Sequence, residues 1–232
     1  MDLYTWSRLL AAAAVEPAAA PDHILALCVE HLDVSGAGMS VAGHDGGTVF
    51  TTATDTISRR IEDLQWTLGE GPCVDALSQG MPVIVSDLSN DPDLVTERWP
   101  TFLAEASSLG VQGVFAFPMQ IGVIKLGVLD LYRLIPGPLA PESLAAALVA
   151  ADAGSTALLE LRGGVAEADG VFVLPFQVQV HQATGMVQVQ LRVTAADALL
   201  RLRSRAFVEG RGLIDVAVDV VERRLRFSEE DA

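Results

Sequence analysis

The spacing of apolar residues predicts that the chain begins with two helices. Residues 3–15 and 22–32 carry apolar side chains at helical intervals, and in the second segment these are Ile24, Leu27, Cys28 and Leu32. Asp22 stands where its carboxylate could cap that second helix. Cys28 is therefore expected in the core rather than at the surface.

The next segments indicate antiparallel strands. Residues 36–42 and 48–54 are rich in small, β-branched and aromatic residues, and the His44-Asp45-Gly46-Gly47 turn lies between them. Asp-Gly between such runs is a strong hairpin signal. Later segments predict a short strand, a helix that Gly110 stops, a second hairpin around Gly122 and a long helix; these are residues 82–86, 97–109, 111–120 with 124–132, and 141–161. The pattern describes an α+β domain whose antiparallel sheet is flanked by helices.

A glycine-containing stretch, residues 163–174, is expected to link this domain to a smaller one. Beyond it the periodicity is ambiguous, because residues 178–191 alternate in part like strands. They also form a longer helical stripe, which comprises Phe176, Val180, Ala183, Val187 and Leu191. Pro175 suits the first turn of a helix, so we predict a helix.

Two further helices are expected after this one. Thr194 is placed to cap the second helix, with Asp197 adding favourable charge near its start. Residues 209–212 turn the chain, and the third helix is expected over residues 213–227. In that helix the pairs Asp219/Arg223 and Glu222/Arg226 would have the favourable i,i+4 order. The domains expected are thus residues 1–21 (N-terminal helix), 22–162, 163–174 (linker) and 175–232.

Charge divides the chain in the same place. The formal net charge is −15, and residues 1–177 hold 7 Lys and Arg against 22 Asp and Glu. Residues 178–232 hold 8 of each, and within residues 192–226 there are 8 Arg and 5 acids. An acidic protein repels nucleic acid as a whole, but a local excess of arginine can still bind it.

The cysteine content and the apolar stretches indicate a cytoplasmic protein without a membrane span. Cys28 and Cys73 provide neither a disulfide framework nor a four-ligand zinc site. The first twenty residues are a poor signal peptide, since Asp2 precedes the apolar run and Arg8 is the only cation. Two uncharged stretches, residues 106–124 and 170–191, are interrupted by Gly, Pro, Gln or Ser and are not expected to cross a membrane.

A set of short motifs resembles the GAF domains of actinobacterial regulators. The matching residues are Trp66-Thr67-Leu68-Gly69-Glu70-Gly71-Pro72-Cys73-Val74-Asp75-Ala76, Pro82-Val83, Asp87-Leu88, Arg98-Trp99-Pro100, Phe115 to Met119 and Leu126 to Tyr132. The resemblance implies a sheet with helices on both faces and a cavity for a small-molecule effector of unknown identity. The Asn-Lys-Phe-Asp-Glu signature of cyclic-nucleotide-binding members is not visible. A GAF fold that serves only for dimerisation is the plainer alternative.

Cys73 is a candidate redox residue, because it follows Gly-Glu-Gly-Pro at an expected helix N-terminus, where a thiolate is favoured. A structural role as a small buried side chain is the alternative. One GAF-fold family reduces free methionine sulfoxide, but that chemistry needs a second thiol, so we expect no enzyme. His23, His31 and His44 could serve as haem ligands, yet surface or turn positions explain them as well, and no metal site is expected.

The C-terminal segment resembles ANTAR domains, the three-helix RNA-binding modules of antitermination regulators. The matching residues are Gln182-Ala183-Thr184-Gly185-Met186, Val193-Thr194, Asp197-Ala198, Leu202-Arg203, Ala206, Arg211, Leu213, Asp215-Val216-Ala217 and Val220. The resemblance implies binding of paired RNA stem-loops. The expected RNA-binding residues are Ala183, Thr184, Gly185, Arg201, Arg203, Arg205 and Arg211. Alternatively, these arginines form a solvated helix face paired with local acids.

Taken with the resemblance, the sequence predicts a signal-responsive antitermination regulator. A GAF-type sensor would control the ANTAR-type domain, and the long helix at residues 141–161 could form the spine of a homodimer. A DNA-binding transcription factor is one alternative, since three short helices can resemble a helix-turn-helix. A thiol-dependent reductase that uses Cys73 is the other.

Overall fold

The computed structural model describes residues 1–42, 48–90, 98–164 and 175–228, and the side chains of residues 48–51, 162–164 and 175–177 are outside the description. The chain divides into two compact units, Met1–Ala166 and Glu167–Ala232. Each unit is considered by itself.

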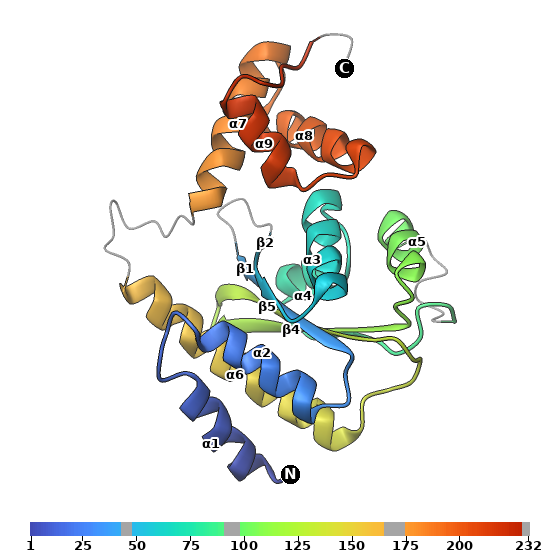
Figure 1. Ribbon diagram of the computed structural model, residues 1–232, viewed down its shortest axis with the longest axis vertical. Coiled ribbons are helices and arrows are strands. Elements are labelled where there is room, and N and C mark those ends of the chain that lie inside the picture. Colours follow the sequence, from blue (N-terminus) through green and yellow to red (C-terminus); the bar gives the residue numbers. More distant parts are fainter. Residues whose placement is uncertain (43–47, 91–97, 165–174, 229–232) are drawn as a thin grey trace. The chain divides into compact units, whose positions relative to one another are not determined.

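A five-stranded antiparallel sheet forms the centre of the first unit (Figure 1). Its strand order is β2-β1-β5-β4-β3, so the two predicted hairpins, β1–β2 and β4–β5, are joined by pairing of β1 with β5. The strands are β1 (Gly36–Ala42), β2 (Thr48–Ala53), β3 (Val83–Val85), β4 (Gly113–Ile121) and β5 (Ile124–Arg133). Residues 43–47, where the first hairpin turn was predicted, lie outside the described residues.

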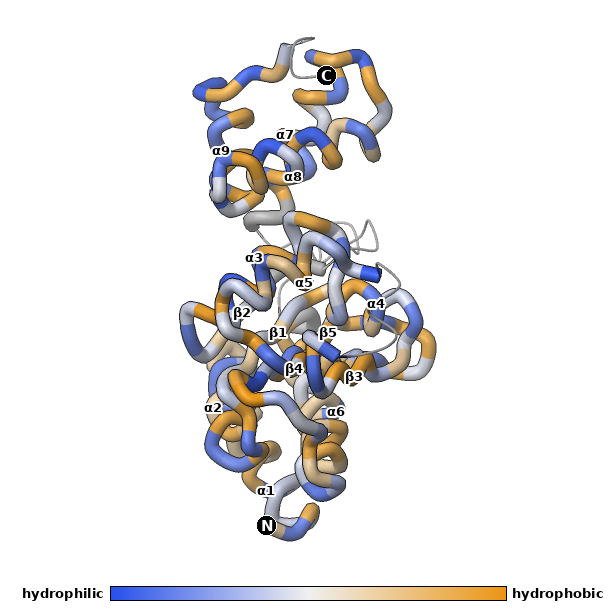
Figure 2. The backbone as a smooth tube through the Cα atoms, turned by 90° about the vertical axis from the view of Figure 1, so that its right-hand side faces the viewer, coloured by the Kyte–Doolittle hydropathy of each residue, from blue (hydrophilic) through white to orange (hydrophobic). Residues whose placement is uncertain are grey.

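Helices cover both faces of this sheet (Figure 1). One face carries α1 (Leu3–Ala13), α2 (Ala20–His31) and α6 (Pro141–Gly164); the other carries α3 (Thr56–Leu68), α4 (Pro72–Gln79) and α5 (Pro100–Ser108). Because side chains alternate along a strand, β4 sends Phe115 and Phe117 toward α6, and Val114 and Ala116 toward α3 and α4. Both faces are thereby apolar, and Figure 2 shows the matching hydrophobic stretches along the central strands.

Most of the predicted elements of this unit are confirmed, and two local details are wrong. Asp22 does not cap α2: the helix begins earlier, its N-cap residue is Ala19, and Asp22 instead accepts a hydrogen bond from the Thr52 hydroxyl. Gly163 and Gly164 do not break the long helix, because α6 extends through them. The remainder of the predicted linker, residues 165–174, lies outside the described residues.

Helix α3 was not predicted, although its start has a clear local cause. Asp55 is the N-cap, and its carboxylate accepts hydrogen bonds from the amides of Ile57 and Ser58 at 2.8 and 2.9 Å. The Ser58 hydroxyl accepts a hydrogen bond from the Asp55 amide in return, which completes a capping box. This interaction places Glu62 and Gln65 on the side of α3 that faces the sheet, where both are buried.

By length and composition, residues 141–161 of α6 could cross a membrane, and the helix is the only one to pass that test among the described residues. In the structure it packs on β4, β5, α1 and α2. Gly154 contributes to this packing, since a Cβ atom there would lie 2.6 Å from the Met119 sulfur. Packing within the first unit accounts for the buried part of this window, which is 44%.

The second unit consists of α7 (Pro175–Leu191), α8 (Ala195–Glu209) and α9 (Leu213–Val221). The helical interpretation of the first segment is confirmed, because Val180, Ala183 and Val187 of the stripe are buried. The predicted cap is also confirmed: the Thr194 side chain accepts the amide of Asp197 at 3.1 Å. Gly210 ends α8 in the left-handed conformation.

The third helix is shorter than predicted. It ends at Val221 rather than continuing to Phe227, and Arg223 adopts a left-handed backbone (φ 62°). The chain then folds back, so that Phe227 is buried and its amide donates a 2.8 Å hydrogen bond to the Gln190 side chain. The predicted pairs Asp219/Arg223 and Glu222/Arg226 do not form, and Asp219 pairs with Arg211 and Arg224 instead.

Candidate functional sites

The connection between α3 and α4 is held by a side-chain hydrogen bond. The Gln65 carbonyl oxygen accepts the backbone amide of Cys73 at 2.7 Å, and both residues are buried. Gly71 lies between them with φ 133° and ψ 173°, a region that only glycine occupies without strain. A Cβ atom at this position would also lie 2.6 Å from the Gln65 oxygen. The Gly-Glu-Gly-Pro-Cys motif is therefore a structural joint that seats α4 against α3.

The same motif also fixes the start of α5. Glu70 accepts hydrogen bonds from the amides of Thr101 and Phe102 at 2.9 and 2.8 Å, which satisfies two free N–H groups of that helix. Asp75 in α4 accepts Arg98 Nε at 2.7 Å and the indole N–H of Trp99 at 3.2 Å. Glu70 of the motif and Asp75 of α4 thus hold α5 in place.

These contacts position two aromatic side chains, which fill the α3/α4 face of the sheet. Trp99 and Phe102 are buried and meet edge to face, with ring centroids 6.2 Å apart. Beside them remains a narrow hollow without room for a water molecule; its lining residues are Gly38, Ser58, Ile61, Glu62, Val114, Asp130, Leu131 and Tyr132. A cavity for an effector was expected on one side of the sheet, and this hollow is too small to be one.

A buried acidic cluster lines one side of this hollow. Glu62 of α3, Cys73 of α4 and Asp130 of β5 bring two carboxylate oxygens and a sulfur within 4.8 Å of one another. All three side chains are buried, and the Ser40 hydroxyl donates a hydrogen bond to Glu62. Gly38 provides the space, because a Cβ atom there would lie 2.6 Å from a Glu62 oxygen.

Burial controls the protonation of this cluster. It raises the pKa of Asp130 to about 7, and it raises the pKa of Glu62 well above its usual range, with the nearby charge of Asp130 adding to the effect. One Glu62 oxygen and both Asp130 oxygens lack a partner of good hydrogen-bond geometry, although the side chains of Cys73, Glu62 and Gln65 lie close enough to Asp130 to lower its pKa against the effect of burial. Two adjacent buried carboxyls cannot both carry an uncompensated charge.

The sequence drew attention to Cys73 but missed its acidic neighbours. Asp130 belongs to a quoted motif without an assigned role, and an acid within an apolar strand was the available signal. Cys73, where a thiolate was expected, is buried. Cys28 lies in α2 on the opposite face of the sheet, and burial raises the pKa of its thiol to about 12. His23 and His31 are exposed on α2, away from the cluster, and His44 lies outside the described residues.

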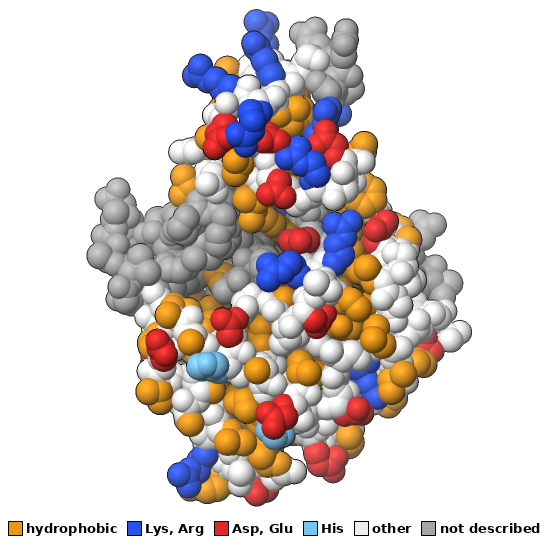
Figure 3. All heavy atoms as spheres, viewed as in Figure 1, with side chains coloured by type: hydrophobic (Ala, Val, Ile, Leu, Met, Phe, Trp, Pro, Cys, Tyr) orange, Lys and Arg blue, Asp and Glu red, His pale blue; other side chains and the backbone are white. Residues whose placement is uncertain are grey.

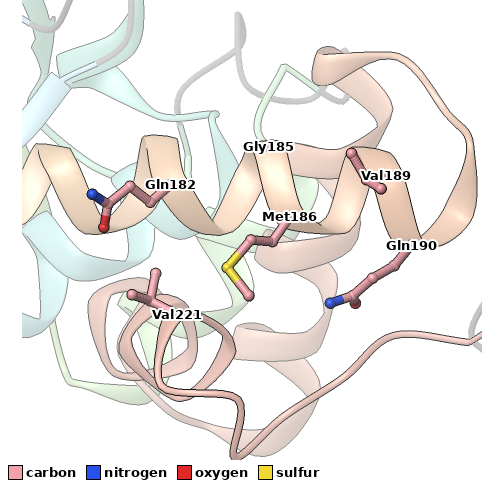
Figure 4. A pocket seen from close by; sticks show the side chains of 6 residues that line it. All are labelled: Gln182, Gly185, Met186, Val189, Gln190 and Val221. Atoms are coloured by element: carbon pink, nitrogen blue, oxygen red, sulfur yellow. The ribbon is translucent and has the colours of Figure 1, made fainter.

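An open groove is present in the second unit (Figure 4). It measures about 550 Å³, and its lining residues are Gln182, Gly185, Met186, Val189 and Gln190 of α7 with Val221 of α9. Figure 4 shows the Met186 side chain extending toward α9 between the two glutamines. The floor is thus apolar, and the two ends carry amides.

The three α7 residues that were predicted to bind RNA differ in burial and in their contacts. Ala183 is fully buried between the helices, and the Thr184 hydroxyl donates a 2.7 Å hydrogen bond to the Val180 carbonyl. Gly185 lines the groove, and a Cβ atom added to it would meet nothing within 4 Å. Of the three, Gly185 has the accessible position that close approach of a ligand requires.

The predicted arginines are largely engaged within the unit. Arg205 pairs with Glu209 at 2.5 Å, and Arg211 pairs with Glu209 at 3.1 Å and with Asp219 at 2.5 Å. Arg201 and Arg203 are half-buried and also make interactions within the structure. For Arg205 and Arg211, the alternative of a helix face paired with local acids describes what is seen, and Figure 3 shows basic and acidic side chains interspersed on this unit.

Three other arginines were not among the residues predicted to bind RNA. Arg192, Arg223 and Arg226 are exposed, and the described part of the chain shows no ion pair for any of them. Arg192 follows the last residue of α7, Arg223 is two residues beyond Val221, and Arg226 precedes Phe227, whose amide binds Gln190. The backbones of Arg192 and Arg226 therefore lie near the Gln190 end of the groove, and that of Arg223 lies close in sequence to its lining residue Val221. This arrangement was not predicted, because the third helix was expected to continue to residue 227, whereas it ends at Val221.

Structural comparison identifies the fold of the first unit. The GAF domains of phosphoenolpyruvate-protein phosphotransferases from Coxiella burnetii and Acinetobacter are similar to this chain with TM-scores of 0.54 and identities of 17% and 10%. These matches cover 71% and 72% of this chain and 98% and 97% of the known domains. A free methionine-R-sulfoxide reductase from Neisseria meningitidis matches with a TM-score of 0.50 at 17% identity, over 69% of this chain and 89% of the enzyme.

The first unit therefore has the GAF fold, an α+β arrangement of a five-stranded antiparallel sheet with flanking helices. No sequence profile of a known protein family matches the chain. No curated protein sequence matches it either. The ANTAR-type identity of the C-terminal helices stays a prediction.

The joint at Gly71 provides a test of the first unit. We expect Gly71→Ala to lower the free energy of unfolding by roughly 3 kcal/mol, because the backbone is strained and the new Cβ displaces Gln65. Gly122→Ala is the matched control: it also has a positive φ, but its Cβ meets nothing, and it should cost about 1 kcal/mol. Urea unfolding followed by tryptophan fluorescence reports this unit, which holds Trp6, Trp66 and Trp99. Equal losses would contradict the proposed joint.

The acidic cluster predicts that stability depends on pH. The measurement is made in buffer that contains EDTA, so that only protons bind to the carboxylates. The pKa of Asp130 is raised on folding, so the folded state holds this proton more tightly than the unfolded state. The resulting contribution to the free energy of unfolding is fully present below about pH 4 and is lost as the pH rises through about 7. Asp130→Asn should therefore lose less unfolding free energy than the wild type over that interval. Asp152→Asn, at an exposed position on α6, is the control. Parallel curves for wild type and Asp130→Asn would refute the predicted coupling.

Proposed function

We propose that this protein is a signal-responsive regulator of transcription antitermination, in which the C-terminal unit binds RNA stem-loops and the GAF-fold unit is the sensor. The observation that carries the proposal is the groove between α7 and α9. It combines an apolar floor, two amide side chains and an exposed helical glycine, Gly185.

The chemistry of the groove fits an unstacked nucleobase. Met186, Val189 and Val221 offer an apolar surface for the face of a base, and the amides of Gln182 and Gln190 can donate and accept hydrogen bonds at its edges. In RNA, such bases occur in loops and bulges rather than in paired stems. An RNA loop is therefore the ligand class that matches the groove.

The unpaired arginines fit the phosphates of such a loop. Arg192 and Arg226 lie near the Gln190 end of the groove, and Arg223 is two residues beyond its lining residue Val221; none of the three has an ion pair among the described residues. Guanidinium groups bind phosphate oxygens with two parallel hydrogen bonds. We therefore assign phosphate binding to these three residues, in place of Arg205 and Arg211, whose ion pairs would have to break first.

A double-stranded DNA ligand fits less well. Readers of the major groove insert a projecting helix between the phosphate backbones. Here the distinctive feature is a concavity, and α8 carries the paired Arg205 with Glu209 instead of a free basic face. We therefore keep DNA binding as the alternative, and the binding experiment below tests it by comparing duplex DNA with stem-loop RNA.

An enzymatic role in thiol chemistry is also less favoured. Cys73 is buried, and Cys28, the only other cysteine, lies across the sheet, so that it cannot reach a reaction intermediate on Cys73. We therefore propose a non-enzymatic, cytoplasmic regulator. Two such units in a homodimer would engage paired stem-loops together, and the exposed Leu148 and Leu159 of α6 are the surface we assign to dimer formation.

Replacing two of the unpaired arginines tests the proposed phosphate contacts. Arg223→Ala with Arg226→Ala should weaken binding to an RNA of two tandem stem-loops about tenfold, and should reduce the slope of log affinity against log salt by about 1.5. Arg205→Ala is the control, because its ion pair with Glu209 is on α8. Equal affinity of the wild type for duplex DNA of the same length would favour the DNA-binding alternative, and an unaltered salt slope in the double variant would refute the phosphate assignment.

Gly185 offers a test that separates binding from stability. Gly185→Ala should stabilise α7 by about 0.5–1 kcal/mol, since alanine is the better helix former and its Cβ meets nothing. The same methyl group narrows the groove, so affinity for the stem-loop RNA should fall. Gln188→Ala, exposed on α7 but not lining the groove, is the control. A more stable variant with undiminished RNA affinity would show that the groove does not receive the base.

A further inference from the structure

We propose that Glu62, Cys73 and Asp130 form a binding site for one divalent transition metal ion of the zinc class. No metal site was expected from the sequence, and the three residues are far apart along the chain. Pairing of β1 with β5 and packing of α3 and α4 on the sheet bring them together.

The donor atoms have the number and spacing of a metal site. Two carboxylate oxygens and one sulfur, each from a different element, lie within 4.8 Å of one another. Zinc in proteins is bound by thiolate sulfur and carboxylate oxygen in a four-coordinate arrangement. The Ser40 hydroxyl donates a hydrogen bond to one Glu62 oxygen and so holds that carboxylate beside the other two donors.

The unsatisfied polar atoms independently indicate a missing ligand. One Glu62 oxygen and both Asp130 oxygens are fully buried without a partner of good geometry, and no ion pair of the described residues involves either acid. Leaving buried polar groups unpaired is costly, and it is more so for carboxylates. A bound cation would provide a partner for an oxygen of each acid at once.

The dimensions and the ligand types restrict the class of ion. The hollow beside Glu62 and Asp130 has no room for a water molecule, so a hydrated ion or an organic ligand does not fit. Magnesium usually keeps several waters, and calcium takes six to eight oxygens. A thiolate among few ligands selects a softer, compact ion such as Zn²⁺.

The surrounding structure holds the sulfur donor in position. Cys73 lies in the first turn of α4, and its amide is bound by Gln65. When the ion binds, the thiol proton and the carboxyl protons leave to solvent, and sulfur and oxygen lone pairs form the bonds to the metal. No electron is transferred, and affinity rises with pH because protons are released.

The direct test uses Co²⁺ as a spectroscopic probe with the full-length chain. After treatment with EDTA and desalting, one equivalent of Co²⁺ should produce a near-ultraviolet thiolate-to-cobalt absorption, and one equivalent of Zn²⁺ should abolish it. Surface histidines cannot give this absorption. Its absence in the wild type at a protein concentration of about 100 μM, well above the expected dissociation constant, would overturn the proposal.

The variants identify the ligands. Cys73→Ser should abolish the absorption, Asp130→Asn should weaken Co²⁺ binding at least tenfold, and Cys28→Ala, on the opposite face of the sheet, should retain both. If Cys73→Ser does not fold, loss of the absorption in Cys28→Ala would overturn the assignment, and its retention would leave Cys73 as the only thiol that can cause it. RNA affinity is measured separately, so either proposal can fail alone.

Discussion

The hydrogen bond between the Gln65 side chain and the Cys73 amide is the contact on which the α3/α4 face depends. It requires glycine at position 71, because the backbone there is strained for any other residue and a side chain would displace Gln65. With α4 seated, Asp75 can hold Arg98 and Trp99, and Glu70 can hold the start of α5. A single buried amide contact thereby fixes the position of three helices.

This joint also explains why a polar cluster can exist inside an otherwise apolar layer. Trp99 and Phe102 exclude water from most of the face, which makes the environment of Glu62 and Asp130 weakly polarisable and raises their pKa values. Gly38 and Ser40 on β1 supply the space and one donor. Protons balance the acids in this environment, and the metal ion that we propose would compete with them.

In the second unit, the polar groups that we assign to binding lie at the surface instead of in the core. Its small core, which includes Ala183, Leu202 and Val216, leaves the outer surface of α7 uncovered, so that the groove remains open to a ligand. Acids pair with the arginines of α8 and of the following turn, whereas the arginines at the ends of α7 and α9 stay exposed. Among the described residues of this unit, the exposed arginines therefore outnumber the acids that pair with them near the ends of α7 and α9.

Local sequence signals determined most elements, and interactions between distant residues decided the sites. The hairpins, the Thr194 cap and the helical stripe of α7 depend on neighbouring residues, so periodicity and turn chemistry predicted them. The end of α9 was not predicted, because binding of the Phe227 amide to Gln190 competes with further helix, and that contact joins residues 37 positions apart. For the same reason the arginine pairing and the Glu62, Cys73 and Asp130 cluster required the tertiary structure. Charge pairing and burial depend on which segments meet in space, and no local pattern records that.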